Sequence, residues 1–182
     1  MNKKLAAALC SGAALVLALT GCSDDSGKKD EWAKNVCDDL QPQLKKIDEA
    51  NASIAEASRA NKSPDEVKKA DSAAFQKVSN AYRAMAKAVQ KAGAPPVDNG
   101  DKLQKDAVKE LNGIAGQYND LKTAAEKLPT GDKFDEGLDS VAAKLKTLGQ
   151  NGDKALRELQ KGEVGQAMAK QESCKKSRVT QK

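Results

Sequence analysis

Apolar residues recur at alternating three- and four-residue steps in four long segments of this chain, and this spacing constrains the fold more than any other feature. In the longest uninterrupted run, Leu103, Leu111, Ile114 and Leu121 keep the helical step. Side chains three and four residues apart lie on one face of an α-helix, so each segment predicts an amphipathic helix. The expected helices span residues 31–58, 64–92, 99–128 and 134–159, followed by a short helix over 163–175.

Turn and capping residues separate these segments. Ser63-Pro64-Asp65-Glu66 has the form of a capping box with proline at the first helical position, so a helix should begin there. Four helices of similar length joined by short connections predict an all-α fold, an antiparallel up-down four-helix bundle with a short C-terminal helix. In that topology the C-terminal helix returns to the end where the first helix begins.

Two of the expected helices contain residues that interrupt helical structure. Pro42 lies inside the first segment and lacks a backbone donor, so we expect a kink there or a short helix before it. Gly149 and Gly152 lie inside the fourth segment and predict a break or bend.

The N-terminus has the layout of a secretory signal peptide. Lys3 and Lys4 precede a 14-residue apolar run, Leu5 to Ala18, that ends in small residues. A membrane-spanning helix is the first alternative, but the run is shorter than the roughly 20 apolar residues that such a helix needs. Ordinary secretion with cleavage near Ala14 or Ala18 and no lipid is the second alternative.

The four residues after this run are Leu19, Thr20, Gly21 and Cys22. They resemble the lipobox of bacterial lipoproteins, in which the cysteine receives a diacylglyceryl thioether and the preceding peptide is removed. The resemblance implies a lipid anchor at Cys22 on the extracytoplasmic face of the cell membrane. It divides the chain into a removed signal peptide, 1–21, a lipidated flexible tether, 22–30, the bundle domain, 31–175, and a polar tail, 176–182.

An exported chain would retain two cysteines for pairing. Cys10 leaves with the signal peptide and Cys22 carries lipid, so Cys37 and Cys174 remain. An oxidising compartment favours a disulfide between them, worth about 5 kcal/mol in the chain-entropy model. Two free thiols and a thiol-redox role are the alternatives, but the sequence offers neither a C-x-x-C pair nor a nearby histidine.

The amino-acid composition argues against most classes of enzyme. The chain has no histidine, which eliminates the commonest general base and the usual zinc and haem ligand, and no phosphate-binding glycine motif is present. We therefore expect no catalytic residue, metal or cofactor. An enzyme that uses an isolated carboxylate or lysine is the remaining catalytic alternative. Lysines interleave with acidic residues and aromatic residues are few, so nucleic-acid binding is not expected either.

The stretch from Asp30 to Cys37, Asp-Glu-Trp-Ala-Lys-Asn-Val-Cys, together with the lipobox and a late cysteine, resembles the small secreted lipoproteins of actinobacteria. That group has no established activity, so the resemblance implies a location. We expect a non-catalytic, membrane-anchored interaction or scaffold domain that binds another envelope protein. The alternative is an envelope binding protein that holds an apolar small molecule or lipid between its helices.

Overall fold

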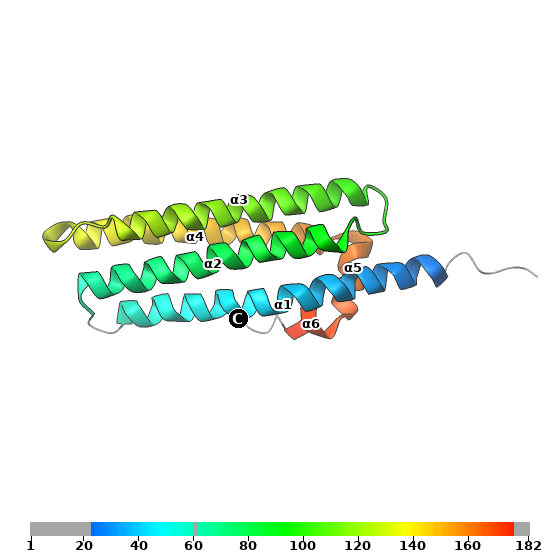
Figure 1. Cartoon of the computed structure of the whole chain (residues 1–182), viewed down its shortest axis with the longest axis horizontal. Coiled ribbons are helices and arrows are strands. Elements are labelled where there is room, and N and C mark those ends of the chain that lie inside the picture. Colours follow the sequence, from blue (N-terminus) through cyan, green and yellow to red (C-terminus); the bar gives the residue numbers. More distant parts are fainter. Residues whose placement is uncertain (1–22, 60–61, 177–182) are drawn as a thin grey trace, which may run out of the picture.

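The computed structural model describes residues 23–59 and 62–176, and this part of the chain is helical without strands. The predicted signal peptide and the tail beyond Lys176 lie outside the described residues. Figure 1 shows the long helices side by side along the long axis of the molecule. The elements are α1 (Ser23–Arg59), α2 (Pro64–Ala92), α3 (Gly100–Glu126), the 3-10 turn η1 (Gly131–Lys133), α4 (Phe134–Leu159), α5 (Gly162–Lys170) and α6 (Glu172–Lys176).

Helix α1 corrects two expectations. Residues 23–30, predicted as a flexible tether, form the first two turns of α1. Lys29 and Asp30 in these turns form ion pairs with Glu163 and Lys170 of α5, which gives the polar segment tertiary partners that its composition does not reveal. The helix also continues through Pro42, so the alternative of a short helix that ends before the proline is wrong, while the kink stays a prediction. A proline removes one backbone donor, and the apolar face on either side of it, from Leu40 to Leu44, still packs on the core.

Helix α2 begins as predicted. The Ser63 hydroxyl accepts from the Glu66 backbone N–H, and the Glu66 carboxylate accepts from the Ser63 backbone N–H at 2.9 Å. The helix ends at Gly93, whose φ of 76° suits glycine. The Trp32 indole N–H donates to the Gly93 carbonyl at 2.9 Å, so α1 holds the chain where it leaves α2.

The core is built around the contact between α2 and α3. The Ser79 hydroxyl, fully buried, donates to the Ala115 carbonyl at 2.7 Å, and the rings of Tyr82 and Tyr118 stack with their centroids 5.7 Å apart. Buried apolar residues from all the long helices join one continuous cluster. This cluster includes Val36, Leu40, Phe75, Val78, Met85, Val89, Leu111, Ile114, Leu121, Val141 and Leu148.

Helix α4 is continuous from Phe134 to Leu159, so a break near Gly149 and Gly152 is wrong, while a bend there stays a prediction. Each glycine in a helix interior costs about 1 kcal/mol relative to alanine. Burial of Val141, Leu148 and Leu159 along one face of α4 offsets this cost.

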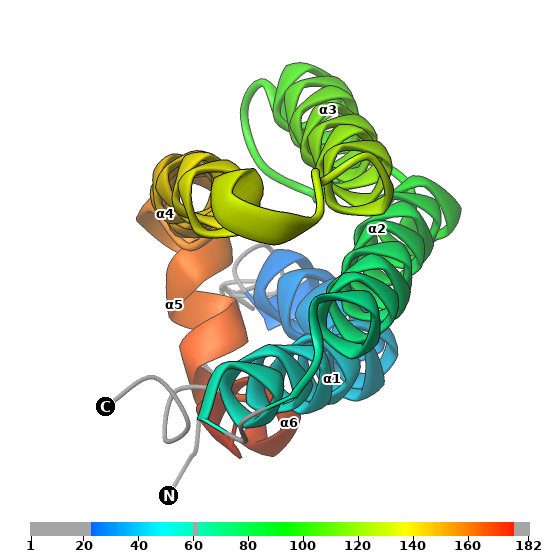
Figure 2. The same ribbon diagram turned by 90° about the vertical axis from the view of Figure 1, so that its left-hand side faces the viewer.

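The C-terminal segment forms two short helices instead of one. Gln171 has extended backbone angles and separates α5 from α6. Helix α5 begins in close contact with the end of α4, because a Cβ on Gly165 would lie 1.7 Å from the Gln160 carbonyl oxygen. In the end-on view of Figure 2, α5 lies between α4 and α1.

The extensive contacts between helices join α1 to α2, α2 to α3, and α3 to α4, while α5 and α6 contact α1. The structure is therefore an all-helical bundle. Direct packing of α4 on α1, which a closed four-helix bundle requires, is not among these extensive contacts, and the up-down four-helix arrangement stays a prediction.

Candidate functional site

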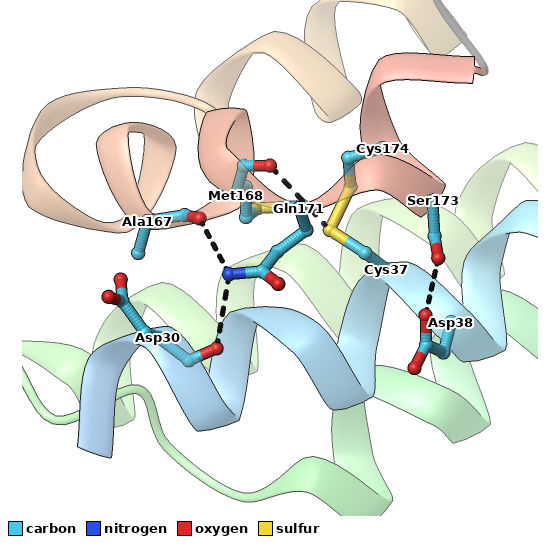
Figure 3. Close-up of a disulfide and its surroundings, with 8 residues drawn as sticks. All are labelled: Asp30, Cys37, Asp38, Ala167, Met168, Gln171, Ser173 and Cys174. Atoms are coloured by element: carbon cyan, nitrogen blue, oxygen red, sulfur yellow. Dashed lines mark hydrogen bonds between the residues drawn. A yellow bond between two sulfur atoms is a disulfide. The ribbon is translucent and has the colours of Figure 1, made fainter. Parts of the chain in front are cut away.

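A disulfide joins the two cysteines that the sequence pairs. The sulfur atoms of Cys37 and Cys174 are 2.05 Å apart and the two Cα atoms are 5.2 Å apart. Cys37 is fully buried on α1, whereas Cys174 on α6 is half-buried. Figure 3 shows the bond linking α6 to the face of α1, with the Met168 carbonyl 4.0 Å from the Cys37 Sγ. A disulfide sulfur carries no hydrogen to donate, so that approach is a packing contact.

Polar contacts flank the disulfide on both sides. The Gln171 amide donates to the Asp30 carbonyl at 3.3 Å and to the Ala167 carbonyl at 3.2 Å, so the residue that separates α5 from α6 is tied to α1 (Figure 3). On the other side the Ser173 hydroxyl donates to the Asp38 carboxylate. The C-terminal segment is therefore held against α1 by one covalent bond and by hydrogen bonds to α1 residues on either side of Cys37.

Hydrogen bonds at this contact stabilise the charged forms of its ionisable side chains. The Lys34 ammonium donates to Asp38 at 2.8 Å, and this bond, together with that from Ser173, lowers the pKa of the Asp38 carboxyl. The hydrogen bond from Lys29 to Glu163, 2.7 Å long, raises the pKa of Lys29. Apart from Lys29 these side chains are largely exposed, and exposed ion pairs contribute little to stability, so the disulfide is the main link.

A cavity of about 930 Å³ lies at the end of the molecule where α1 begins. The start of α1, the loop between α2 and α3, and the junction of α4 with α5 line it. Each of its lysines is paired with an acidic residue of the same lining: Lys29 with Glu163, Lys102 with Asp106, and Lys161 with Glu158. The three lysines of the cavity are therefore already neutralised by acidic neighbours.

A second cavity, of about 540 Å³, lies between α3 and α4. Leu121 and Leu148, both buried, form its apolar part, and Ala124 and Ala143 also line it. Small side chains at the walls let another apolar group approach the two leucines closely.

Asp71 is a residue that the sequence reasoning missed. It lies on α2 with 3% of its surface exposed, and its Oδ1 atom has no hydrogen-bond partner among the described residues. The signal was present, because Val67, Asp71, Ala74 and Val78 follow one another at four-, three- and four-residue steps. Burial raises the pKa of Asp71 to about 6.

The four lipobox residues, Leu19, Thr20, Gly21 and Cys22, lie outside the described residues. Helix α1 begins at Ser23, the position that directly follows the predicted lipidation site. Within residues 23–59 and 62–176, no helix combines the length and apolar character needed to cross a bilayer. The same part of the chain has no group of three or more metal-ligating side chains placed to hold an ion.

Comparison of the chain with protein-family models, with curated proteins and with solved structures finds no match.

Replacing both cysteines, Cys37→Ala with Cys174→Ala, should lower the free energy of unfolding by about 5 kcal/mol, the chain-entropy value for a loop of this length. Urea unfolding monitored by circular dichroism measures the change. A reductant should reproduce the loss in the wild type and should not affect the double variant. A wild-type urea midpoint that does not move after complete reduction would contradict the structural role of the bond.

Asp71→Asn should raise the free energy of unfolding above that of the wild type at neutral pH, and the gain should be smaller at acid pH. The pKa of Asp71 is about 6 in the folded state and 3.8 is its ordinary value. Stability from the protonated carboxyl is thus fully present below about pH 4 and is lost as pH rises through about 6. By the time the pH has risen above the upper limit, the variant should have gained about 3 kcal/mol over the wild type.

Thermal unfolding of both proteins at about pH 4 and about pH 7.5 brackets the titration and measures this gain. Asp139→Asn, at an exposed carboxyl on α4, is the matched control and should show no such pH-dependent difference. A gain that is equal at both pH values would mean that Asp71 does not titrate between them.

Proposed function

We propose that this protein is a lipid-anchored envelope lipoprotein whose helical domain is a non-catalytic interaction or scaffold module. Its proposed location is the extracytoplasmic face of the cell membrane. The lipobox, Leu19 to Cys22, supports the anchor, and two acyl chains on one residue meet the requirement for stable membrane attachment. A disulfide between Cys37 and Cys174 accords with an oxidising compartment outside the cytoplasm.

The observation that carries the scaffold proposal is the covalent attachment of the last described helix, α6, to the first, α1. Helix α1 begins at Ser23, and Cys174 is covalently bound to α1 at Cys37. A lipid at Cys22 would therefore join a rigid element directly, without a flexible spacer. In an up-down arrangement of the four long helices, the domain would extend from the bilayer by about 40 to 55 Å at 1.5 Å per residue.

The side of the bundle formed by α3 and α4 is the face that we propose for a protein partner. Among the long helices, α4 has extensive contacts with α3 alone, and the cavity of about 540 Å³ between them is lined by the half-buried Ala124 and the exposed Ala143. A partner helix that presents apolar residues at three- and four-residue spacing would pack on these two alanines, next to the buried Leu121 and Leu148.

A second candidate function is the binding of an apolar small molecule or lipid by the helical domain. The apolar lining of a cavity favours this function, because cavities of a few hundred cubic ångströms with a mostly apolar lining are typical of small-molecule sites. The α3–α4 cavity, with its buried leucines, has that size and character.

Cys22→Ala should abolish lipid attachment. Cells fed a radioactive fatty acid should label the wild-type protein and not the variant, and the variant should move from the membrane fraction to the soluble fraction after export. Cys10→Ala is the control, because that cysteine is predicted to leave with the signal peptide. Equal labelling of wild type and Cys22→Ala would contradict the anchor.

A photo-cross-linking residue at Thr147, an exposed position in the lining of the α3–α4 cavity, should capture one envelope protein reproducibly. The same residue at Lys87, an exposed position on α2, is the matched control and should not capture it. The captured protein should bind the purified wild type directly and should bind Ala143→Lys, at an exposed position in the same lining, at least tenfold more weakly. Failure to enrich any protein over the Lys87 control would contradict a scaffold role for this face.

A further inference from the structure

The cavity of about 540 Å³ between α3 and α4 combines buried leucines with one exposed charge of each sign. Leu121 of α3 and Leu148 of α4 are buried and form its apolar part. Asp120 and Lys144 also line it, and both of these side chains are exposed. The carboxylate therefore comes from one helix and the ammonium from the other, on two helices that pack along each other (Figure 2).

The two charged side chains of this cavity have no internal partner. Neither Asp120 nor Lys144 forms an ion pair or a hydrogen bond within the part of the chain that the structure describes. In the larger cavity near the start of α1, by contrast, each lysine is paired with an acidic side chain of the same lining. The α3–α4 cavity thus presents two separate charges of opposite sign to whatever enters it.

Two further side chains of the lining can accept hydrogen bonds. The Thr147 hydroxyl donates its hydrogen to the Ala143 carbonyl at 3.2 Å, so toward a ligand its oxygen can only accept. The side-chain N–H of Gln117 donates to the Gly113 carbonyl at 3.4 Å, which leaves the side-chain oxygen as an acceptor. Gln117 precedes Asp120 by three residues and lies on the same side of α3. An ammonium group, which has three hydrogens to donate, suits such acceptors beside a carboxylate.

The two charges select against ligands that carry a single charge. A ligand with only a carboxylate would be attracted by Lys144 and repelled by Asp120, and a ligand with only an ammonium would meet the reverse. A molecule that carries both groups satisfies both charges. Because Asp120 and Lys144 are exposed, the charged groups of such a ligand keep contact with water and escape the cost of full burial.

We propose that the α3–α4 cavity binds a zwitterionic molecule with an apolar side chain, the chemical class of the apolar α-amino acids. The ammonium of the ligand donates to Asp120, and its carboxylate accepts from Lys144. Its side chain packs on Leu121 and Leu148, between the small side chains of the lining alanines. The volume of the cavity lies within the range of small-molecule sites. This inference rests on the second candidate function and names the class of its ligand.

Isothermal titration of the full chain with L-leucine and three analogues tests the proposal, because all four probes share one branched apolar body. Isoamylamine lacks the carboxylate of leucine, 4-methylpentanoate lacks the ammonium, and 3-methyl-1-butanol lacks both charges. The wild type should bind leucine at least tenfold more tightly than it binds any of the three analogues, since leucine alone satisfies both charges of the cavity.

Two variants assign each charge of the ligand to its partner. Asp120→Asn should weaken the binding of leucine and of isoamylamine at least tenfold, without weakening that of 4-methylpentanoate. Lys144→Gln should weaken the binding of leucine and of 4-methylpentanoate at least tenfold, without weakening that of isoamylamine. Asp139→Asn and Lys146→Gln, at exposed positions of α4 outside the lining, are the matched controls and should bind leucine like the wild type.

Ala143→Trp tests the position of the apolar side chain. Ala143 is exposed in the lining, so a larger side chain there should cover the buried leucines and abolish the binding of all four probes without disturbing the fold. An unchanged leucine affinity in Asp120→Asn or in Lys144→Gln, or leucine binding that persists in Ala143→Trp, would each overturn the site.

The uncharged probe separates this inference from the function on which it rests. Leucine bound no more tightly than 3-methyl-1-butanol would overturn the zwitterionic class of the ligand and leave the binding of apolar molecules in place. Absence of binding by all four probes would overturn the site and the second candidate function together. Fatty-acid labelling at Cys22 and cross-linking at Thr147 test the anchored scaffold separately.

Discussion

The covalent bond between Cys37 and Cys174 closes a structure whose other extensive contacts join helices that follow one another along the chain. Helix α1 packs on α2, α2 on α3, and α3 on α4, so each of these contacts needs only a short loop to form. The contacts of α1 with α5 and α6 are different, because they join residues more than 130 positions apart. The entropy of closing so long a loop opposes these contacts, and the disulfide removes that opposition from the folding equilibrium.

Where the C-terminal segment is held also decides which parts of the bundle are covered. Around Cys37 the helices α5 and α6 cover α1, and the hydrogen bonds of Gln171 and Ser173 fix them there. Further along α1, Leu44 and Ile47 stay half-buried, and across the bundle Leu138 and Leu145 of α4 do so too. The molecule is thus tightly joined at the end where α1 begins, and less completely packed beyond it. Asp71 is buried on α2, and its Oδ1 atom has no partner among the described residues.

Sequence pattern predicted the helices well where apolar spacing and capping residues agreed. Ser63 and Glu66 mark the start of α2, and the structure begins that helix at Pro64. The errors came where a local signal was outweighed by tertiary contacts. Residues 23–30 contain no apolar side chain, yet they are helical, with Lys29 and Asp30 paired to residues of α5. Pro42, Gly149 and Gly152 reduce local helix stability, yet α1 and α4 continue through them because each helix buries an apolar face on both sides.

The sequence by itself determined the helical class, the predicted pairing of Cys37 with Cys174, and the absence of histidine, because these follow from periodicity, counting and side-chain chemistry. The sequence also contains the lipobox-like residues Leu19 to Cys22, on which the proposed location depends. Only the tertiary structure decided that α5 and α6, rather than α4, make the extensive contacts that close the chain onto α1, and that Asp71 is buried without a partner. The physical reason is that a helical stripe specifies which face is buried but not against which helix. That choice depends on loop geometry and on the summed contacts of residues far apart in the chain.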